Sequence, residues 1–222
     1  MRDLTEVGEA IRTDLDARHR AREAALEASR RSIRNAANAI RAMHRGERDL
    51  AEQLLGEARA ELARGVAASA GHGAVRYAGF LTDAEKEVAE AATFVAIVTG
   101  SALPAPDVLG VEAAAYANGL AEAIGELRRH LLDVVRDAVG SVEARAEAEG
   151  LARSEALLEA MDDIHAVLVT MDFPDGVTGG LRRSTDVARS IIERTRGDLT
   201  TTLVQANLRT ALETHRRQVL EA

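Results

Sequence analysis

The chain has 222 residues and no cysteine, so disulfides, thiolate catalysis and zinc–thiolate sites are excluded. Hydrophobic residues make up 46% and charged residues 29%, a balance typical of a globular protein and too apolar for a disordered one. The sequence shows no apolar run of membrane-spanning length and no charged-then-apolar leader. It therefore predicts a cytoplasmic protein that does not bind a membrane.

The net charge of −8 is unevenly distributed along the chain. Residues 17–48 hold nine arginines against three glutamates, a local charge of +6, which leaves −14 for the rest. The overall acidity is therefore a weak argument against a nucleic-acid partner, because a local basic segment is enough to contact phosphates.

The first predicted element is a single helix over residues 4–44. This stretch has no proline and only one glycine, Gly8. A helix of about 40 residues is about 60 Å long. We expect the rest of the bundle or another subunit to pack along it. Its apolar positions follow a three-and-four spacing: Leu4, Val7, Ile11, Leu15, Leu26, Ile33, Ala37, Ile40 and His44.

The rest of the chain predicts further helices separated by loops at 69–73, 101–110 and 173–180. Thr82 and Glu85 have the spacing of a capping box at one helix start, and Asp107 is expected to cap another. No segment alternates apolar and polar residues with period two. The sequence predicts one all-α domain over 1–222, a bundle of six to seven helices. Helices are expected at 50–68, 82–99, 111–139, 151–169, 181–196 and 200–220, with a short polar helix at 141–149.

Two pairs of glutamates are candidates for metal binding. Glu87 and Glu90 are spaced i, i+3 and share a helix face with Ala84, Ala91, Phe94 and Val98. Carboxylates in an apolar stripe must be paired, protonated or bound to a metal. Glu122 and Glu126 are spaced i, i+4 on another helix, and two such pairs can form an oxygen-rich site for Mg²⁺ or Mn²⁺. The alternative is that these glutamates face solvent, as is common in a chain with 36 acidic residues.

A line of arginines is a candidate phosphate-binding track. Arg30, Arg34, Arg41 and Arg45 recur at helical spacing, while His19 and Arg22 interrupt the apolar stripe. The alternative is a solvated face paired with neighbouring acids. Residues 181–196 hold a second basic segment, and with only two tyrosines, three phenylalanines and no tryptophan, any nucleic-acid binding would depend on phosphates more than on base stacking.

A third candidate pairs Asp162 with His165. Their i, i+3 spacing is that of carboxylate–histidine metal pairs in helical bundles. A hydrogen bond on the helix surface is the alternative.

Four segments, in order, resemble the translin superfamily, and more closely its factor-X branch than translin itself. They are LDARHRAREAALEASRRSIRNAANAIRAMHR, KEVAEAATF, EAIGELRR and LRRSTDVARSIIE. The resemblance implies an all-helical subunit that assembles into a closed, roughly octameric shell and binds RNA inside. It also implies that the factor-X branch is a metal-dependent endoribonuclease. The family's catalytic acids fall on Glu87, Glu90, Glu122 and Glu126, with Glu122 in place of an aspartate.

The resulting hypothesis is a Mg²⁺- or Mn²⁺-dependent endoribonuclease that forms a homo-octamer and cleaves single-stranded or short structured RNA. One alternative is a non-catalytic RNA- or DNA-binding protein of the same fold. Another is a ferritin-like metal or redox bundle, which would need a histidine beside the carboxylates, and a third is an oligomeric scaffold. The predicted contacts to the nucleic-acid backbone are Arg22, Arg30, Arg34, Arg41, Arg45 and Arg76.

Overall fold

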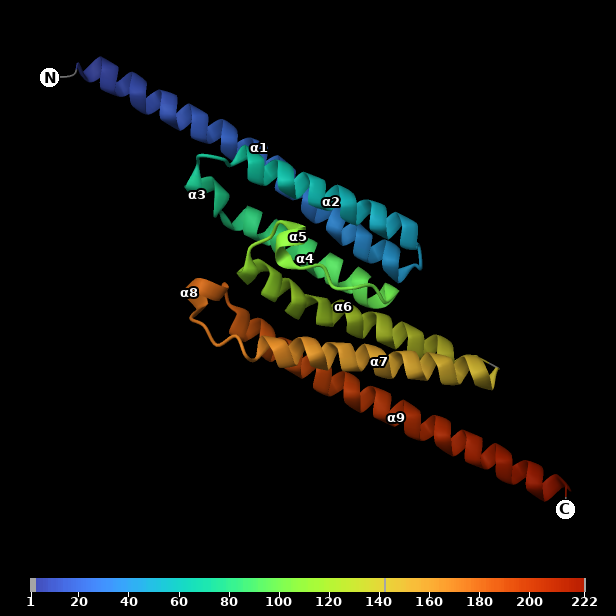
Figure 1. Cartoon of the computed structure of the whole chain (residues 1–222). Coiled ribbons are helices and arrows are strands. Elements are labelled where there is room, and N and C mark those ends of the chain that lie inside the picture. Colours follow the sequence, from blue (N-terminus) through green and yellow to red (C-terminus); the bar gives the residue numbers. More distant parts are fainter. Residues whose placement is uncertain (1–2, 142, 222) are drawn as a thin grey trace. The chain divides into compact units, whose positions relative to one another are not determined.

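The computed structural model describes residues 3–141 and 143–221, and these residues form helices and connecting turns without a strand (Figure 1). This confirms the predicted all-α class and the very long first helix. Met1, Arg2, Val142 and Ala222, which belong to the predicted domain 1–222, lie outside the described residues. No helix in the described ranges combines the length and hydropathy that a transmembrane segment needs. The helices are α1 Leu4–His44, α2 Arg48–Ala68, α3 Gly73–Arg76, α4 Gly79–Thr99, α5 Pro106–Leu109, α6 Ala113–Val139, α7 Ala144–Leu168, α8 Asp175–Thr178 and α9 Leu181–Glu221.

Two predicted helix breaks are wrong. Residues 181–221 form the single helix α9, and α7 runs unbroken from Ala144 to Leu168 where a short helix and a longer one were expected. Glycine inside a helix costs only about 1 kcal/mol, which packing can offset. Gly197 lies between the buried Thr195 and Leu199. Gly150 packs on Ala138, where an added Cβ would lie 2.5 Å from the alanine methyl group.

Asp107 is not the cap of the following helix. It lies inside the single-turn helix α5, which begins with Pro106, ends at Leu109 and has Gly110 as its C-cap residue. Gly110 has a φ of 71°, a left-handed conformation that glycine adopts without strain. The turn of α5 therefore ends before α6 begins.

The chain divides into two compact units. The first comprises residues 1–120 with 177–179, and the second comprises 121–176 with 180–222. Helix α6 begins in the first unit and continues without interruption into the second. The single domain predicted from the sequence stays a prediction.

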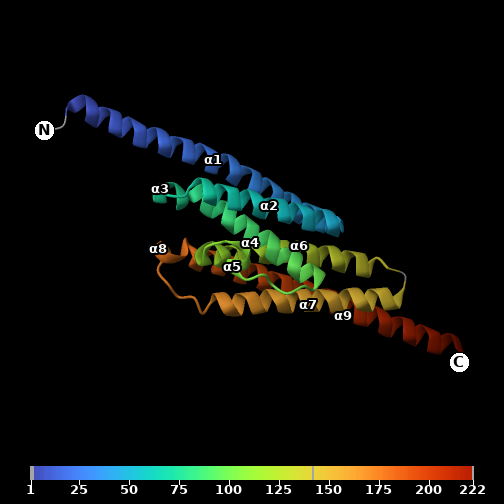
Figure 2. The ribbon, with the colours of Figure 1, turned by 45° about the horizontal axis from the view of Figure 1, so that its top comes forward.

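In the first unit, α1 and α2 form an antiparallel hairpin that packs through small side chains (Figures 1 and 2). Ala25 and Ala28 are fully buried, and an added Cβ on Gly65 would lie 3.3 Å from the Ala28 methyl group. The buried Ser32 hydroxyl donates a 2.9 Å hydrogen bond to the carbonyl of Ala58. Small residues thus let the two helix backbones approach closely along this hairpin.

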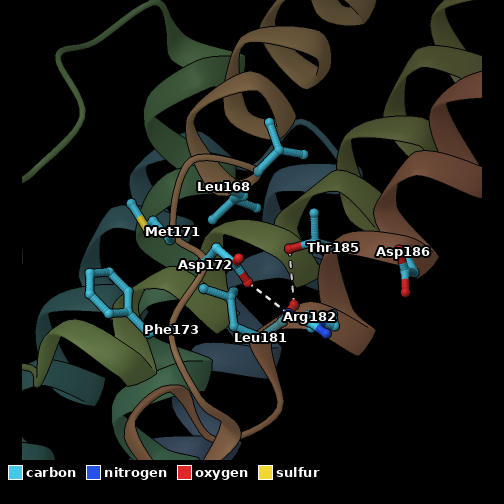
Figure 3. Close-up of a pocket in the computed structure, with 9 residues that line it drawn as sticks. Leu168, Met171, Asp172, Phe173, Leu181, Arg182, Thr185 and Asp186 are labelled. Atoms are coloured by element: carbon cyan, nitrogen blue, oxygen red, sulfur yellow. Dashed lines mark hydrogen bonds and ion pairs between the residues drawn. The ribbon is translucent and has the colours of Figure 1, made fainter.

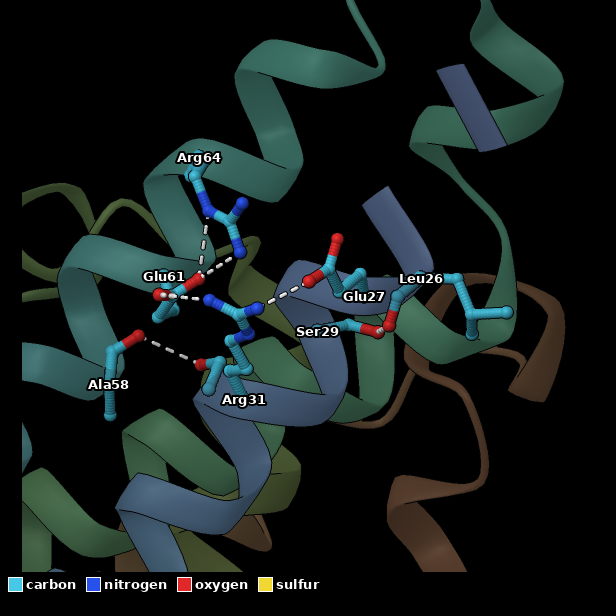
Figure 4. Close-up of polar contacts among 8 residues, drawn as sticks. Leu26, Glu27, Ser29, Arg31, Ala58, Glu61 and Arg64 are labelled. Carbon is cyan, nitrogen blue, oxygen red and sulfur yellow. Dashed lines mark hydrogen bonds and ion pairs between the residues drawn. The ribbon is translucent and has the colours of Figure 1, made fainter. Parts of the chain in front are cut away.

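Charged side chains extend this hairpin contact to its surface (Figure 4). Arg31 on α1 pairs with Glu27 on the same helix and lies 3.9 Å from Glu61 on α2. Glu61 in turn pairs with Arg64 at 2.5 Å. Because these groups are mostly exposed, each pair contributes at most about 1 kcal/mol.

The N-terminal third of α1 is not covered by other parts of its unit. Leu4, Ile11 and Leu15 are 83%, 55% and 54% exposed, and Figure 1 shows this end of α1 projecting beyond α2. The apolar spacing of these residues is that of a helix face that packs against a partner.

In the second unit, α7 packs beside α9 (Figures 1 and 2). Met161 and Leu168 of α7 are fully or almost fully buried, as are Ala188 and Ile192 of α9. The apolar faces of these two helices therefore form much of the core of this unit.

The start of α4 differs from the predicted capping box. The helix begins at Gly79, so Thr82 lies inside it and is exposed. Glu85 is fully buried, and its Oε1 atom lies 2.9 Å from Nη2 of Arg76 on α3. Burial raises the pKa of Glu85, and the positive charge of Arg76 opposes that rise. Glu85 therefore forms a tertiary ion pair with Arg76 in place of the predicted capping box.

We expect Arg76→Met to lower the free energy of unfolding by about 3 kcal/mol at pH 8, because it leaves Glu85 buried without its cation. The substitution raises the folded-state pKa of Glu85 further above its unfolded value. The folded variant is then favoured while Glu85 is protonated, and stability is lost as the pH rises through that pKa. Urea unfolding at pH 5 and pH 8 measures the difference.

The double variant Arg76→Met/Glu85→Gln should recover most of the loss at pH 8. Arg18→Met, which breaks an exposed pair with Asp14, serves as the control and should change stability by less than about 1 kcal/mol. An equal loss at both pH values in Arg76→Met would contradict the role assigned to the buried pair.

Candidate metal centre

Helix α4 presents Glu87 and Glu90 at the edge of its buried face. Both side chains are half-buried, whereas Ala84, Ala91, Phe94 and Val98 on the same helix are buried. Residues three apart are neighbours on a helix surface, so the two carboxylates project together. The local sequence of α4 thus provides one half of an acidic site.

Helix α6 meets this turn of α4 at Gly119, and the two backbones are in close contact. A Cβ on Gly119 would lie 2.7 Å from the Ala89 methyl group and from the Lys86 carbonyl oxygen, and 2.9 Å from the Glu90 amide nitrogen. Glu122 follows Gly119 by three residues on the same unbroken helix, about one turn further on. Continuity of α6 therefore carries Glu122 to the acid pair on α4.

Glu87, Glu90 and Glu122 form a group that suits a metal ion. Each is half-buried, and each offers a carboxylate oxygen within 4.8 Å of the other two. Glu126, the fourth predicted acid, is half-buried one turn further along α6 and is not a member of this group of three. Its predicted role as a ligand stays a prediction.

The chemistry of the group selects among metals. Its donors are carboxylate oxygens without histidine or cysteine, and hard cations such as Mg²⁺ and Mn²⁺ prefer such ligands. The three residues present therefore fit the predicted cofactor, and the group lacks the histidine that a ferritin-like site would need.

The predicted arginine track is exposed along α1 and at its C-terminal end. Arg30 and Arg34 are exposed and form no ion pair with any residue in the described ranges. Arg41 donates to Asn38 at 2.7 Å, and Arg45 pairs with Glu47 at 2.6 Å. Two of these four guanidinium groups are thus available to a phosphate without breaking an internal contact.

Arg22 and Arg76 lie beside aromatic rings that the sequence did not single out. The guanidinium carbon of Arg22 is 5.9 Å from the centre of the Phe80 ring, and that of Arg76 is 5.3 Å from the centre of the Tyr77 ring. Tyr77 is 72% exposed. Arg76 also pairs with Glu112 at 3.0 Å, so its predicted contact with RNA has to coexist with two ion pairs.

Asp162 pairs with Arg196 of α9, whose Nη2 atom lies 2.6 Å from each carboxylate oxygen. No group of three acids or histidines within the described residues includes Asp162 or His165. The structure therefore supplies Asp162 with a cation partner from another helix.

A separate pocket of about 250 Å³ lies in the second unit, between the end of α7 and the start of α9 (Figure 3). Leu168, Met171 and Leu181 contribute apolar side chains to it. Arg182 donates a 2.7 Å hydrogen bond to Asp172 at its exposed rim. The four candidate glutamates are not among its lining residues.

The chain is similar to a curated protein and to several solved structures, although no family model matches it. An uncharacterized protein of Methanocaldococcus jannaschii is 28% identical over 194 residues, which cover 86% of this chain and 81% of that protein.

Among solved structures, the AfC3PO–duplex RNA complex matches with a TM-score of 0.77 and 30% identity, covering 89% of this chain and 96% of that one. A crystal structure of AfC3PO matches with a TM-score of 0.75 and 29% identity, covering 89% of this chain and 97% of that one. Apo-NeC3PO, at 0.72 and 14% identity with 91% and 98% covered, shares the fold. The chain belongs to the C3PO proteins of the translin superfamily.

We expect Mn²⁺ to stabilise the protein through the acidic group, because a ligand that binds only the folded state adds free energy of unfolding by mass action. At one hundred times its dissociation constant the gain is about 2.7 kcal/mol, or roughly 5–10 °C in Tm for a chain of this size. Differential scanning fluorimetry with Mn²⁺ and with EDTA measures the shift.

Glu90→Gln should abolish most of this shift. Asp83→Asn is the matched control, since Asp83 is an exposed acid on the same helix that is not a member of the group. An equal shift in wild type and Glu90→Gln would place the metal elsewhere.

Proposed function

We propose that this protein is a metal-dependent endoribonuclease that acts inside a homo-oligomeric shell. The observation that carries the proposal is the group of Glu87, Glu90 and Glu122, which meets within 4.8 Å in a chain of the C3PO family. The resemblance of KEVAEA and EAIGEL to the catalytic segments of the factor-X branch assigns the same glutamates.

In this proposal Glu87, Glu90 and Glu122 hold Mg²⁺ or Mn²⁺, and Glu126 assists from the next turn of α6. The bound ion supplies charge stabilisation at the scissile phosphate and a water of lowered pKa. The half-buried carboxylates fix the place of the ion relative to α4 and α6. Cleavage then leaves 5′-phosphate and 3′-hydroxyl ends.

RNA is the proposed substrate, single-stranded or short and structured. AfC3PO was solved with duplex RNA. Duplex RNA is recognised mainly through its backbone and shape, which suits a protein with many arginines and few aromatic residues. Arg30 and Arg34 are the main proposed phosphate contacts, because they can bind a phosphate without breaking an ion pair within the described residues. The further proposed contacts are Arg22, Arg41, Arg45 and Arg76.

Self-association into an octamer is the proposed assembly. The uncovered face of α1, formed by Leu4, Val7, Ile11 and Leu15, spans three turns and faces solvent in the single chain. Contiguous apolar faces of this kind mark contacts between proteins. A second copy of the chain is the proposed occupant.

We expect the purified protein to cleave a 5′-labelled single-stranded RNA in the presence of Mg²⁺, and we expect EDTA to abolish this cleavage. Glu90→Gln and Glu126→Ala should each lower the cleavage rate at least 100-fold, because each removes a carboxylate from the proposed centre. Asp83→Asn should retain the wild-type rate. Denaturing gels give the rate, and circular dichroism confirms that each variant is folded.

Binding of the same RNA, measured by fluorescence anisotropy over a salt series, separates a nuclease from a non-catalytic binder. Arg30→Ala/Arg34→Ala should weaken binding and reduce the salt slope by about 1.5, since each lost phosphate contact contributes about 0.7–0.9. Arg18→Ala/Arg31→Ala, whose guanidinium groups already pair with Asp14 and Glu27, is the charge-matched control. Tight, salt-dependent binding with no cleavage in any metal would establish the binding protein instead.

We expect light scattering to give a mass near eight times the 23.7 kDa of one chain. Ile11→Glu/Leu15→Glu should shift the protein to smaller species, because it places two charges on the apolar face of α1. Thr13→Glu, an exposed change on the opposite side of the same helix, should leave the mass unchanged. A wild-type monomer would contradict the proposed shell.

A further inference from the structure

We propose that Gly119 is a positioning residue for the metal centre: its lack of a side chain sets the distance between α4 and α6 at which Glu122 joins Glu87 and Glu90. This inference rests on the proposed function, because it assumes that the acidic group binds a divalent cation. Gly119 itself offers no side chain to a metal or to RNA.

The contact at Gly119 leaves no room for a side chain. Two of the three atoms that an added Cβ would approach, the Lys86 carbonyl oxygen at 2.7 Å and the Glu90 amide nitrogen at 2.9 Å, belong to the backbone of α4. A backbone atom cannot rotate away as the end of a side chain does. Alanine at this position therefore has to push the two helices apart, by about 1 Å if carbon–carbon contacts return to their ordinary 3.5–4.0 Å.

The contact is in register with the acids. Lys86 directly precedes Glu87, and Glu90 carries both the contacted amide and one of the carboxylates. On α6, Glu122 follows Gly119 by one turn and so lies on the same side of its helix. A displacement at Gly119 is therefore transmitted to the separation between Glu122 and the pair on α4.

Gly125 shows that a close contact does not explain every glycine in α6. An added Cβ there would meet no heavy atom within 4 Å. Replacing glycine by alanine in a helix normally gains about 0.5–1 kcal/mol. Gly125→Ala is thus a matched control, with the same substitution, the same helix and no clash.

The experiment is titration of the RNA-free protein with Mn²⁺, with free Mn²⁺ measured by electron paramagnetic resonance. Unfolding of the metal-free protein is measured in parallel. Gly119→Ala should weaken Mn²⁺ binding at least tenfold, whereas Gly125→Ala should stay within twofold of wild type. A merely structural role for Gly119 would lower the stability of the metal-free protein and leave the dissociation constant of the folded fraction unchanged.

The outcomes separate the two claims. If wild type binds Mn²⁺ and Gly119→Ala binds it equally well, the positioning role is overturned while the proposed metal centre stands. If wild type binds no Mn²⁺, the proposed metal centre and this inference both fail. Should Gly119→Ala not fold, the double variant Ala89→Gly/Gly119→Ala removes the contact between methyl groups. It should fold and still bind Mn²⁺ more weakly than wild type, because both backbone contacts remain; wild-type affinity in it would overturn the inference.

Discussion

Contact between helix backbones through alanine and glycine is the constraint on which this structure depends. Helices that pack through large side chains stay about 8–10 Å apart. Here Ala28 meets Gly65 where α1 packs on α2, and Ala89 meets Gly119 where α4 packs on α6. Each glycine costs about 1 kcal/mol of helix propensity. At Gly65 and Gly119 that cost is offset because the missing side chain lets two helices approach closely.

Helix α4 uses its carboxylates in two different ways. Glu85 lies in the core and needs Arg76, because a buried carboxylate without a cation is costly. Glu87 is two residues later, about 200° around the helix, and is half-buried. The same helix therefore carries one fully buried acid that faces a fixed cation and two half-buried acids at the edge of its apolar face.

Much of the fold followed from local sequence, whereas contacts across helices did not. The absence of proline between Leu4 and His44 predicted α1 at its observed bounds, and the i, i+3 spacing predicted that Glu87 and Glu90 project together. The capping box at Thr82 and Glu85 was a sound local pattern. It was overridden because Arg76, nine residues earlier, folds back onto Glu85. Gly119 was not recognised since its role depends on which helix lies opposite, and spacing carries no such information.

The glutamate at position 122, where the family resemblance implies an aspartate, has a physical rationale in the packing at Gly119. Helices that cross at 20–50° are offset sideways from each other by roughly 1.5–3.5 Å at a point three residues, or a 4.5 Å rise, beyond their contact. An additional methylene extends a carboxylate by about 1.5 Å, which is comparable. A longer acid one turn beyond the contact can therefore span the sideways offset that crossing helices produce. Close contact at Gly119 and a long side chain at Glu122 are in this sense complementary, because changing either one changes the distance between the same carboxylates.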